Sequence, residues 1–102
     1  MNPRLTLLEK LAADARADSF TWYALAMEYR KEARIADALR AFETLRERDP
    51  GYLPMYLMTG QMLNGASRRD EARVWLERGL TLARERGDGK ALGELEEELE
   101  GG

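Results

Sequence analysis

The residue types that most often carry catalysis or bind metals are missing from this sequence. It contains no His and no Cys in 102 residues, so the commonest general base, the best thiol nucleophile and the usual ligands of transition metals are absent. Carboxylates are plentiful, but they are scattered over predicted solvent-facing positions without a paired arrangement for acid and base roles. Gly87-Asp88-Gly89 lacks the following Gly, Lys and Ser or Thr of a phosphate-binding loop. We therefore expect no catalytic residue, no metal site and no cofactor.

The one local cluster of basic residues comprises Arg68, Arg69 and Arg73. A phosphate group or an acidic partner could dock there. However, Asp70 and Glu71 interrupt the positive charge, and Glu77 lies one helical turn beyond Arg73, where the two side chains can form an ion pair. The favoured interpretation is a solvated face with local ion pairs.

Composition and charge narrow the class of protein. With 44% hydrophobic and 34% charged residues, the chain is expected to fold as one globular domain. A formal net charge of -3 is unlike the positive footprint of a nucleic-acid-binding protein. The longest nonpolar stretch, Tyr52 to Met58, contains Pro54 and is far shorter than the roughly 20 residues of a membrane-spanning helix. Without cysteines, the expected location is the reducing cytoplasm.

Apolar residues recur at spacings of three and four, which predicts six helices. Pro3 and Pro54 suit opening turns, Asp18 or Ser19 can cap a helix, and Gly65 can end one in the left-handed conformation. The expected segments are about Pro3 to Ala15, Ser19 to Glu32, Ile35 to the break at Asp49-Pro50-Gly51, Pro54 to Asn64-Gly65, the vicinity of Asp70 to the break at Gly87, and about Lys90 to Leu99. Their inward faces are predicted to hold Leu5, Leu8, Leu11 and Ala15; Ala38, Leu39, Phe42 and Leu45; Ala72, Trp75, Leu76, Gly79, Leu80 and Ala83; and Leu92, Leu95 and Leu99.

A repeat of 34 residues brings the two middle helical hairpins into register. Large residues recur where two helices must fill a gap, and small residues recur where two backbones must approach closely. The matched pairs are Trp22 with Tyr56, Ala26 with Gly60, Tyr29 with Leu63, Ala38 with Ala72, and Phe42 with Leu76.

This pattern resembles the tetratricopeptide repeat (TPR), and the chain looks like a small bacterial-type member of that family. The first repeat reads Trp22, Leu25, Ala26, Tyr29, Ala38, Phe42 and Pro50, and the second reads Tyr56, Thr59, Gly60, Leu63, Ala72, Leu76 and Gly79, with Arg84 in place of the closing proline. The resemblance implies an all-α fold, a short α–α superhelix of antiparallel helix pairs with terminal capping helices. It divides one domain, 1–102, into a capping helix at 1–17, repeats at 19–52 and 53–86, and a second capping helix at 88–100.

Some positions depart from the family pattern. Ala33 stands where these repeats usually have glycine between their two helices, so the first interhelical turn is expected to be shifted or strained. The same register places Leu8 and Leu11 like Phe42 and Leu45, so the first helix resembles the second half of a repeat. Glutamates crowd the last helix near its C-terminus, where negative charge opposes the helix dipole and favours fraying.

The first helix of each repeat is apolar on more than one face, as the second stripe Phe20, Tyr23 and Met27 illustrates. In the family these helices line a concave groove. The resemblance assigns to that groove Tyr23, Met27, Arg30, Leu57, Gln61 and Asn64. Such a groove would accept an extended peptide or an amphipathic helix of a partner protein.

Other interpretations of these residues remain open. Tyr23, Met27, Leu57 and Met58 could simply pack against neighbouring helices, and the methionines of the fourth helix could be gap-filling core. The basic clamp with which some family members bind acidic chaperone tails is missing, because its positions include Tyr23, Met27 and Met58. The favoured function is a non-enzymatic protein-interaction module, and the alternative is a structural repeat protein that forms a homodimer.

Overall fold

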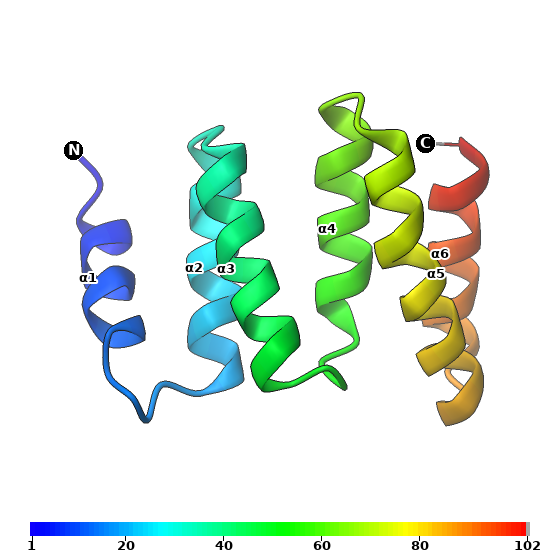
Figure 1. Ribbon diagram of the computed structural model, residues 1–102, viewed down its shortest axis with the longest axis horizontal. Helices are drawn as coiled ribbons and strands as arrows, with labels where there is room; N and C mark the ends of the chain where they lie inside the picture. Colours follow the sequence, from blue (N-terminus) through cyan, green and yellow to red (C-terminus); the bar gives the residue numbers. More distant parts are fainter. Residues whose placement is uncertain (102) are drawn as a thin grey trace. The chain divides into compact units, whose positions relative to one another are not determined.

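The computed structural model describes residues 1–101, which form six α-helices and no strand. In chain order they are α1 (Pro3–Ala12), α2 (Ser19–Lys31), α3 (Ile35–Arg48), α4 (Pro54–Gly65), α5 (Arg69–Arg86) and α6 (Gly89–Gly101) (Figure 1). Consecutive helices pack in pairs within two compact units, Met1–Pro50 and Gly51–Gly102. In the first unit α2 contacts both α1 and α3, and in the second α4, α5 and α6 contact one another. The predicted all-α class of packed helix pairs is confirmed.

Three helices begin with a side chain that accepts a hydrogen bond from a free backbone amide. Asn2, Asp18 and Asp88 each accept from the amide three residues later, at 3.0, 2.8 and 3.0 Å. These bonds satisfy donors that have no partner inside the helix. Pro3 and Pro54 occupy the opening turns of α1 and α4, as expected from their missing N–H groups.

The turn between α2 and α3 and the turn between α4 and α5 share one geometry, although neither uses glycine. Ala33 and Ser67, which lie 34 residues apart, adopt left-handed backbone angles with φ of 58° and 62°. After the first, the amide of Arg34 donates back to the carbonyl of Tyr29 at 2.9 Å, and the second turn repeats this bond at 2.8 Å. This is the bonding pattern that closes a helix around a left-handed residue. Of the two consequences expected from Ala33, a shifted turn or a strained one, the structure shows the strained one. The turn keeps the position of its counterpart, and Ala33 adopts the left-handed conformation.

Glycine at either strained position should stabilise the protein. An L-residue in the left-handed region costs roughly 1–2 kcal/mol, and the extra freedom of glycine in the unfolded chain offsets part of the gain. We expect Ala33→Gly or Ser67→Gly to raise the free energy of unfolding by about 1 kcal/mol, measured by urea denaturation. Gly87 is the matched control, because it takes the same conformation with φ 66° after α5. Gly87→Ala should lower stability by a similar amount, and a stabilising Gly87→Ala would contradict the argument.

Helix α1 is shorter than predicted, and two of the residues predicted to be buried on its inward face are exposed. Leu5, Leu8 and Ala12 are buried, whereas Leu11 is 48% exposed and Ala15 lies exposed beyond the helix end. The buried residues are spaced three and four apart. Leu11 follows Leu5 by six residues, which rotates it about a third of a turn around the helix axis from Leu5. Its side chain therefore points away from the buried face.

The end of α4 also differs from the expectation. Gly65 is the last helical residue and keeps a negative φ, and Ser67 takes the left-handed conformation instead. Here the left-handed residue lies two positions beyond the last helical residue, so a glycine at the end of the pattern is not necessarily the terminator. At the C-terminal end, α6 runs from Gly89 to Gly101, with Leu95 fully buried.

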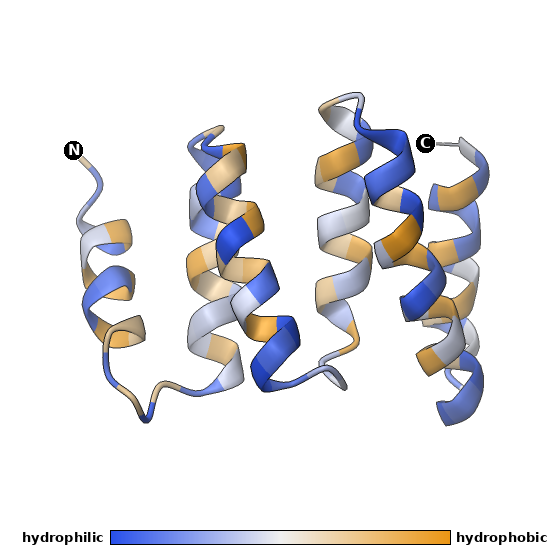
Figure 2. Ribbon diagram, in the orientation of Figure 1, coloured by the Kyte–Doolittle hydropathy of each residue, from blue (hydrophilic) through white to orange (hydrophobic). Residues whose placement is uncertain are grey.

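Each unit has its own apolar interior, and each helix carries both hydrophobic and hydrophilic positions (Figure 2). The predicted inward residues of α5 are all buried, and so are those of α3 except Leu39, which is half-buried. Leu92 and Leu99 of α6 are likewise half-buried. The large apolar side chains with almost no exposure are Phe42 and Leu45 in the first unit and Met55, Leu63, Leu76 and Leu95 in the second. The 3.6-residue period therefore located most of the core correctly.

Candidate functional site

In the first unit, one face of α2 carries three of the residues assigned to a groove. Tyr23, Met27 and Arg30 follow one another at spacings of four and three, and each is half-buried. Phe20 shares this face and is 63% exposed, which makes it the most exposed apolar side chain of α2. Phe20 was not among the six residues assigned to the groove. Its spacing of three residues from Tyr23 and seven from Met27 nevertheless predicts that it lies on the same helical face.

Tyr23 is fixed by the core of the first unit. Its ring packs edge-on against Phe42 of α3, with 6.4 Å between ring centroids and 66° between ring planes. Edge-to-face contacts of this kind are favourable and directional. Tyr23 is thus a packing residue that keeps part of its surface accessible, so the two interpretations of this residue overlap.

In the second unit, α4 carries the other three assigned residues, Leu57, Gln61 and Asn64, all half-buried. The side-chain amide of Asn64 is already engaged, because it donates to the carbonyl of Glu98 at 3.3 Å and to its carboxylate at 3.0 Å. Asn64 therefore fastens α4 to α6 and has less capacity for a ligand than its exposure suggests.

A pocket of about 430 Å³ opens between the first turns of α4 and those of α6. Leu57 lines it, so this assigned residue lies at a real concavity. The apolar lining residues are Leu53, Pro54, Leu57, Met58, Ala91 and Leu95, and the charged ones are Arg86, Asp88, Lys90 and Glu94.

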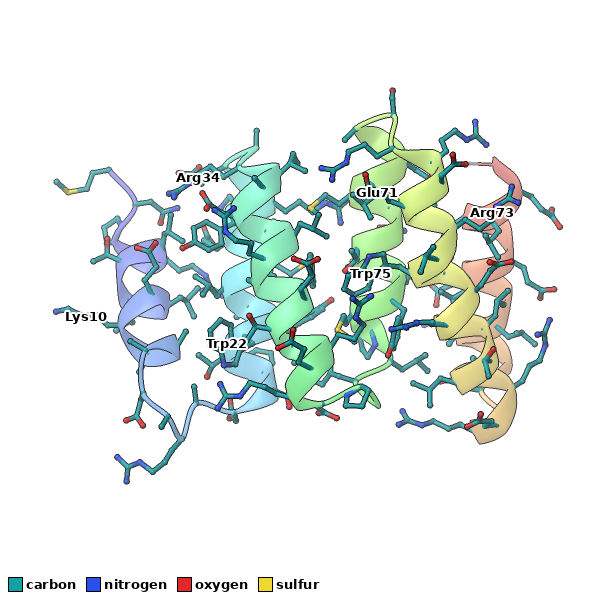
Figure 3. The ribbon with its side chains drawn as sticks, in the orientation of Figure 1. Lys10, Trp22, Arg34, Glu71, Arg73 and Trp75 are labelled. Atoms are coloured by element: carbon teal, nitrogen blue, oxygen red, sulfur yellow. The ribbon has the colours of Figure 1, made fainter. Side chains whose placement is uncertain are left out.

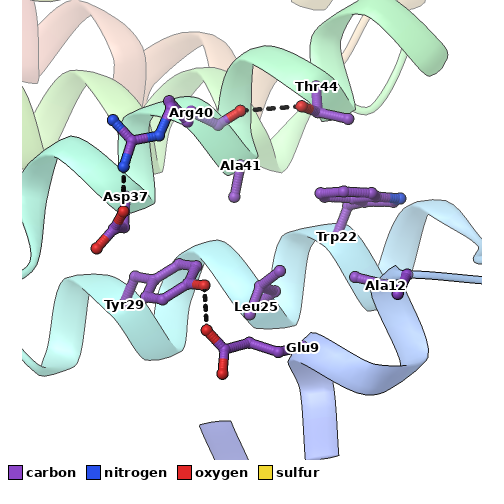
Figure 4. Close-up of a pocket in the computed structure, with 10 residues that line it drawn as sticks. Glu9, Ala12, Trp22, Leu25, Tyr29, Asp37, Arg40, Ala41 and Thr44 are labelled. Carbon is purple, nitrogen blue, oxygen red and sulfur yellow. Dashed lines mark hydrogen bonds and ion pairs between the residues drawn. The ribbon is translucent and has the colours of Figure 1, made fainter. Parts of the chain in front are cut away.

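A second pocket, of about 330 Å³, lies in the first unit among α1, α2 and α3 (Figure 4). Ala41 of α3 lines it together with Trp22. In the 34-residue register Ala41 corresponds to Trp75, which packs against Tyr56 with ring centroids 6.1 Å apart. The small residue at position 41 therefore leaves open the space that an indole fills in the second unit.

The polar groups around this second pocket are mostly paired with one another. The Tyr29 hydroxyl donates to Glu9 at 2.5 Å, and Arg40 donates to Asp37 (Figure 4). Asp37 also accepts from Arg34 at 2.8 Å. The bond from Arg34 holds the pKa of Asp37 below its ordinary value. Desolvation, together with the bond to Glu9, raises the pKa of Tyr29 to about 12. Such groups are committed to the fold and leave little to orient a ligand.

Comparison with solved structures identifies the family. One match is a crystal structure of a tetratricopeptide repeat domain protein from Salinibacter ruber, whose sequence is 39% identical to this chain. The alignment covers 80% of this chain and 91% of that one, with a TM-score of 0.72. The chain belongs to the tetratricopeptide repeat family. A solution structure of a TPR domain protein from the same organism agrees, at 37% identity over 84% of this chain and 87% of that one, with a TM-score of 0.75.

A further structural match covers nearly the whole chain. The solution structure of a protein from Bordetella parapertussis is 27% identical over 98% of this chain and 87% of that one, with a TM-score of 0.82. No family model matches the sequence, and no curated protein matches it. TPR domains are generally protein–protein interaction modules and are typically non-catalytic. Within residues 1–101 no cluster of three potential metal ligands occurs, and no helix there is long and apolar enough to cross a bilayer.

The junction between α1 and the first TPR hairpin contains a buried carboxylate that sequence reasoning missed. Glu28 is only 7% exposed; Asn2 donates to it at 2.9 Å and Arg4 pairs with it at 3.1 Å. The bond from Asn2 lowers the pKa of Glu28. No pattern in the sequence connects the cap residue of one helix with a residue of another helix 26 positions away, so this contact could be found only in the fold.

The contact between Tyr29 and Glu9 predicts an alkaline transition at the same junction. Because its folded pKa of about 12 exceeds the ordinary 10.0, Tyr29 contributes stability below pH 10 that is lost as pH rises toward 12. We expect Tyr29→Phe to cost about 1 kcal/mol at pH 8, since the bond lies at the surface. Thermal unfolding by circular dichroism should show this gap closing by about pH 12. A gap that is unchanged across this range would contradict the assignment.

The basic cluster of the TPR domain pairs differently from the expectation. Arg68 forms a two-pronged ion pair with Glu71, at 3.0 and 2.7 Å. The predicted pair of Arg73 with Glu77 was wrong, because within the described residues no ion pair joins them. Arg73, a residue of α5 (Figure 3), instead lines a small pocket together with residues of α6. Arg69 lines the same pocket, which also contains two carboxylates. The arrangement is close to neutral and gives no preference for an anion.

Proposed function

We propose that this TPR domain is a non-enzymatic adaptor of the cytoplasm that binds a peptide or helical segment of a partner protein. The domain comprises a capping helix at 1–17, repeats at 19–52 and 53–86, and a capping helix at 88–100. The partner segment is proposed to lie in a concave groove of the kind that the first helices of repeats line in this family. The residues proposed to contact it are Tyr23, Met27, Arg30, Leu57, Gln61 and Asn64, to which we add Phe20.

The exposed Phe20 is the observation that carries this proposal. At 63% exposure its ring contributes little to the folded core. Burying a large apolar side chain against a partner contributes about 1.5–3 kcal/mol. Together with the accessible parts of Tyr23 and Met27, it supplies an apolar strip on α2, and Arg30 adds a polar group at the end of that strip. This combination suits a segment that presents apolar anchors and a defined orientation.

Substitution of the exposed ring tests the groove without disturbing the core. Affinity capture of the partner from the native host should be abolished by Phe20→Asp and strongly reduced by Leu57→Asp, with helicity by circular dichroism unchanged. Val74→Asp is the matched control, because Val74 is 51% exposed on α5, the second helix of its repeat. A partner that is retained by Phe20→Asp and Leu57→Asp, or lost equally with Val74→Asp, would place the binding surface elsewhere.

Self-association is the second candidate, and the outer face of α1 favours it. Leu7 and Leu11 lie one turn apart on that face and are 57% and 48% exposed. A second copy of the chain could cover both leucines, which would complete the apolar packing of a terminal helix. Light scattering over a dilution series should then show a dimer that Leu11→Glu dissociates. A monomer at every concentration would exclude this function.

A further inference from the structure

In the first unit, the pocket among α1, α2 and α3 takes the place of a side chain that the second unit has. Trp75 packs against Tyr56 with ring centroids 6.1 Å apart, and it is only 5% exposed. The equivalent residues in the 34-residue register are Ala41 and Trp22, and beside them a space of about 330 Å³ stays open. The second repeat therefore fills this place with an indole, and the first repeat leaves it as a pocket.

Aromatic and small apolar side chains form the walls of this pocket. Trp22, Leu25 and Tyr29 follow one another on α2 at spacings of three and four, which places them on one face of the helix (Figure 4). Ala41 comes from α3 and Ala12 from α1, and both are buried. An aromatic ring gains from such walls, because edge-to-face or offset stacking adds to the burial of its apolar area. The lining therefore suits a flat ring, for which the two alanines leave room.

The carboxylates at the rim are already paired with groups of this chain. The Tyr29 hydroxyl donates to Glu9, and Asp37 accepts from Arg34 and Arg40. These bonds leave the charges in place, but the two arginines balance the two carboxylates. A charged ligand thus finds no excess of opposite charge at the rim, and a neutral ring loses nothing by its lack of charge.

Both aromatic rings of the pocket also have an arginine over them. The Arg34 guanidinium lies 4.8 Å from the centroid of the Tyr29 ring, and the Arg48 guanidinium lies 5.5 Å from that of the Trp22 ring. Such contacts already use the attraction of a ring face for cations, and their positive charge repels a further cation. A cationic aromatic molecule is therefore disfavoured here relative to a neutral one.

We propose that this pocket binds a free, neutral aromatic molecule of about the size of indole, in the position that Trp75 takes in the second repeat. Its volume lies within the range of about 300–1,000 Å³ that is typical of ligand sites. A free ring needs only the open space, whereas a tryptophan within a polypeptide would press its flanking peptide groups against the paired side chains of the rim. None of the residues proposed for the peptide groove lines this pocket, so the site is separate from that function.

The bound ring also joins α1 to the rest of the first unit. Glu9, Ala12 and Ala13 of the α1 segment complete the lining, so the full site exists only while α1 is packed against α2. A ligand that binds the packed state alone stabilises that state by mass action. Binding should therefore slow the exchange of α1 amide hydrogens with deuterium.

Titration of the intact chain with indole, followed by NMR of its backbone amides, tests the inference. We expect saturable one-to-one binding with a dissociation constant of about 1 mM or lower, and the largest chemical-shift changes at the residues that line the pocket. Cyclooctanol, which is neutral but not flat, and protonated tryptamine should each bind at least about fivefold more weakly. N-acetyltryptophan amide, which carries the same ring between two peptide bonds, should also bind more weakly than indole.

Variants of α3 separate the pocket from general effects. Ala41→Trp installs the side chain of the second repeat, and it should abolish indole binding and the protection of α1 by indole. If Ala41→Trp disturbs the fold, Ala41→Leu fills less of the space and should weaken binding about tenfold. Ala36→Trp is the matched control, because Ala36 is exposed on the same helix outside the pocket lining. Its affinity for indole should match that of the unaltered chain.

Three results would overturn this inference. The first is the absence of saturable indole binding at millimolar concentrations, and the second is binding that resists both substitutions of Ala41 or is lost equally with Ala36→Trp. The third is tighter binding of N-acetyltryptophan amide than of indole, which would make the occupant a tryptophan of another protein. Since Phe20 and Leu57 lie outside this pocket, each of these results leaves the proposed peptide groove to its own test.

Discussion

Phe42→Ala should lower the free energy of unfolding by about 3–5 kcal/mol, the usual cost of truncating a fully buried phenylalanine. Phe42 has no exposed surface and lies on the inward face of α3. Its removal leaves a cavity that neighbouring helices cannot fill without breaking their own contacts. Because Tyr23 packs edge-on against this ring, the same change should loosen one of the proposed groove residues.

Urea denaturation followed by circular dichroism measures this effect. Phe42→Leu, which installs the residue found at the equivalent position of the second repeat, should cost only about 1–2 kcal/mol. Val74→Ala is the surface control and should change stability by less than about 0.5 kcal/mol, because Val74 is half exposed. A loss of similar size for Phe42→Ala and Val74→Ala would show that Phe42 does not lie in a packed core.

Gly60→Ala should lower the free energy of unfolding by about 2 kcal/mol, although alanine is the better helix former. A Cβ atom at this position would lie 2.3 Å from Cδ2 and 2.5 Å from Cγ of Leu76. Leu76 is 1% exposed and has nowhere to move. Gly79 makes a similar close approach, since an added Cβ would lie 2.7 Å from Cβ of Tyr56.

At Gly93, another glycine of the second unit, the same substitution to alanine should stabilise the protein. Gly93 is exposed within α6, and an added Cβ would meet nothing within 4 Å. Gly93→Ala should therefore raise stability by about 1 kcal/mol through helix propensity alone. Both glycines receive the same substitution, so opposite signs in urea denaturation would isolate the effect of close helix packing. A stabilising Gly60→Ala would contradict it.

Helical periodicity and the 34-residue register predicted most of the fold, because burial imposes both patterns on the sequence. The stripe that includes Ala72, Leu76 and Ala83 is inward as expected. The failures arose where local signals were ambiguous. Leu11 fits an apolar spacing yet faces outward, and the left-handed residue after α4 is Ser67, which has no compositional signature of that conformation.

Less of the candidate site could be predicted, since it depends on contacts between helices. The buried Glu28 accepts a hydrogen bond from Asn2, which caps another helix, and Asn64 donates to Glu98 of another helix. The open space beside Trp22 did leave a signal, because Ala41 and Trp75 occupy equivalent positions with very different volumes. The six groove residues themselves stay a prediction that the variants above will test.

The way in which α1 joins its neighbours also sets the order in which the first unit opens. The helix has ten residues, and only Leu5, Leu8 and Ala12 of them are buried. Elements with few buried apolar contacts detach at lower free energy than the rest of a domain. Amide hydrogens of α1 should accordingly exchange with deuterium before those of α2 and α3. Acidification that protonates Glu28 should lower the protection of α1, measured relative to the intrinsic exchange rate at each pH, because the bond from Asn2 lowers the pKa of Glu28.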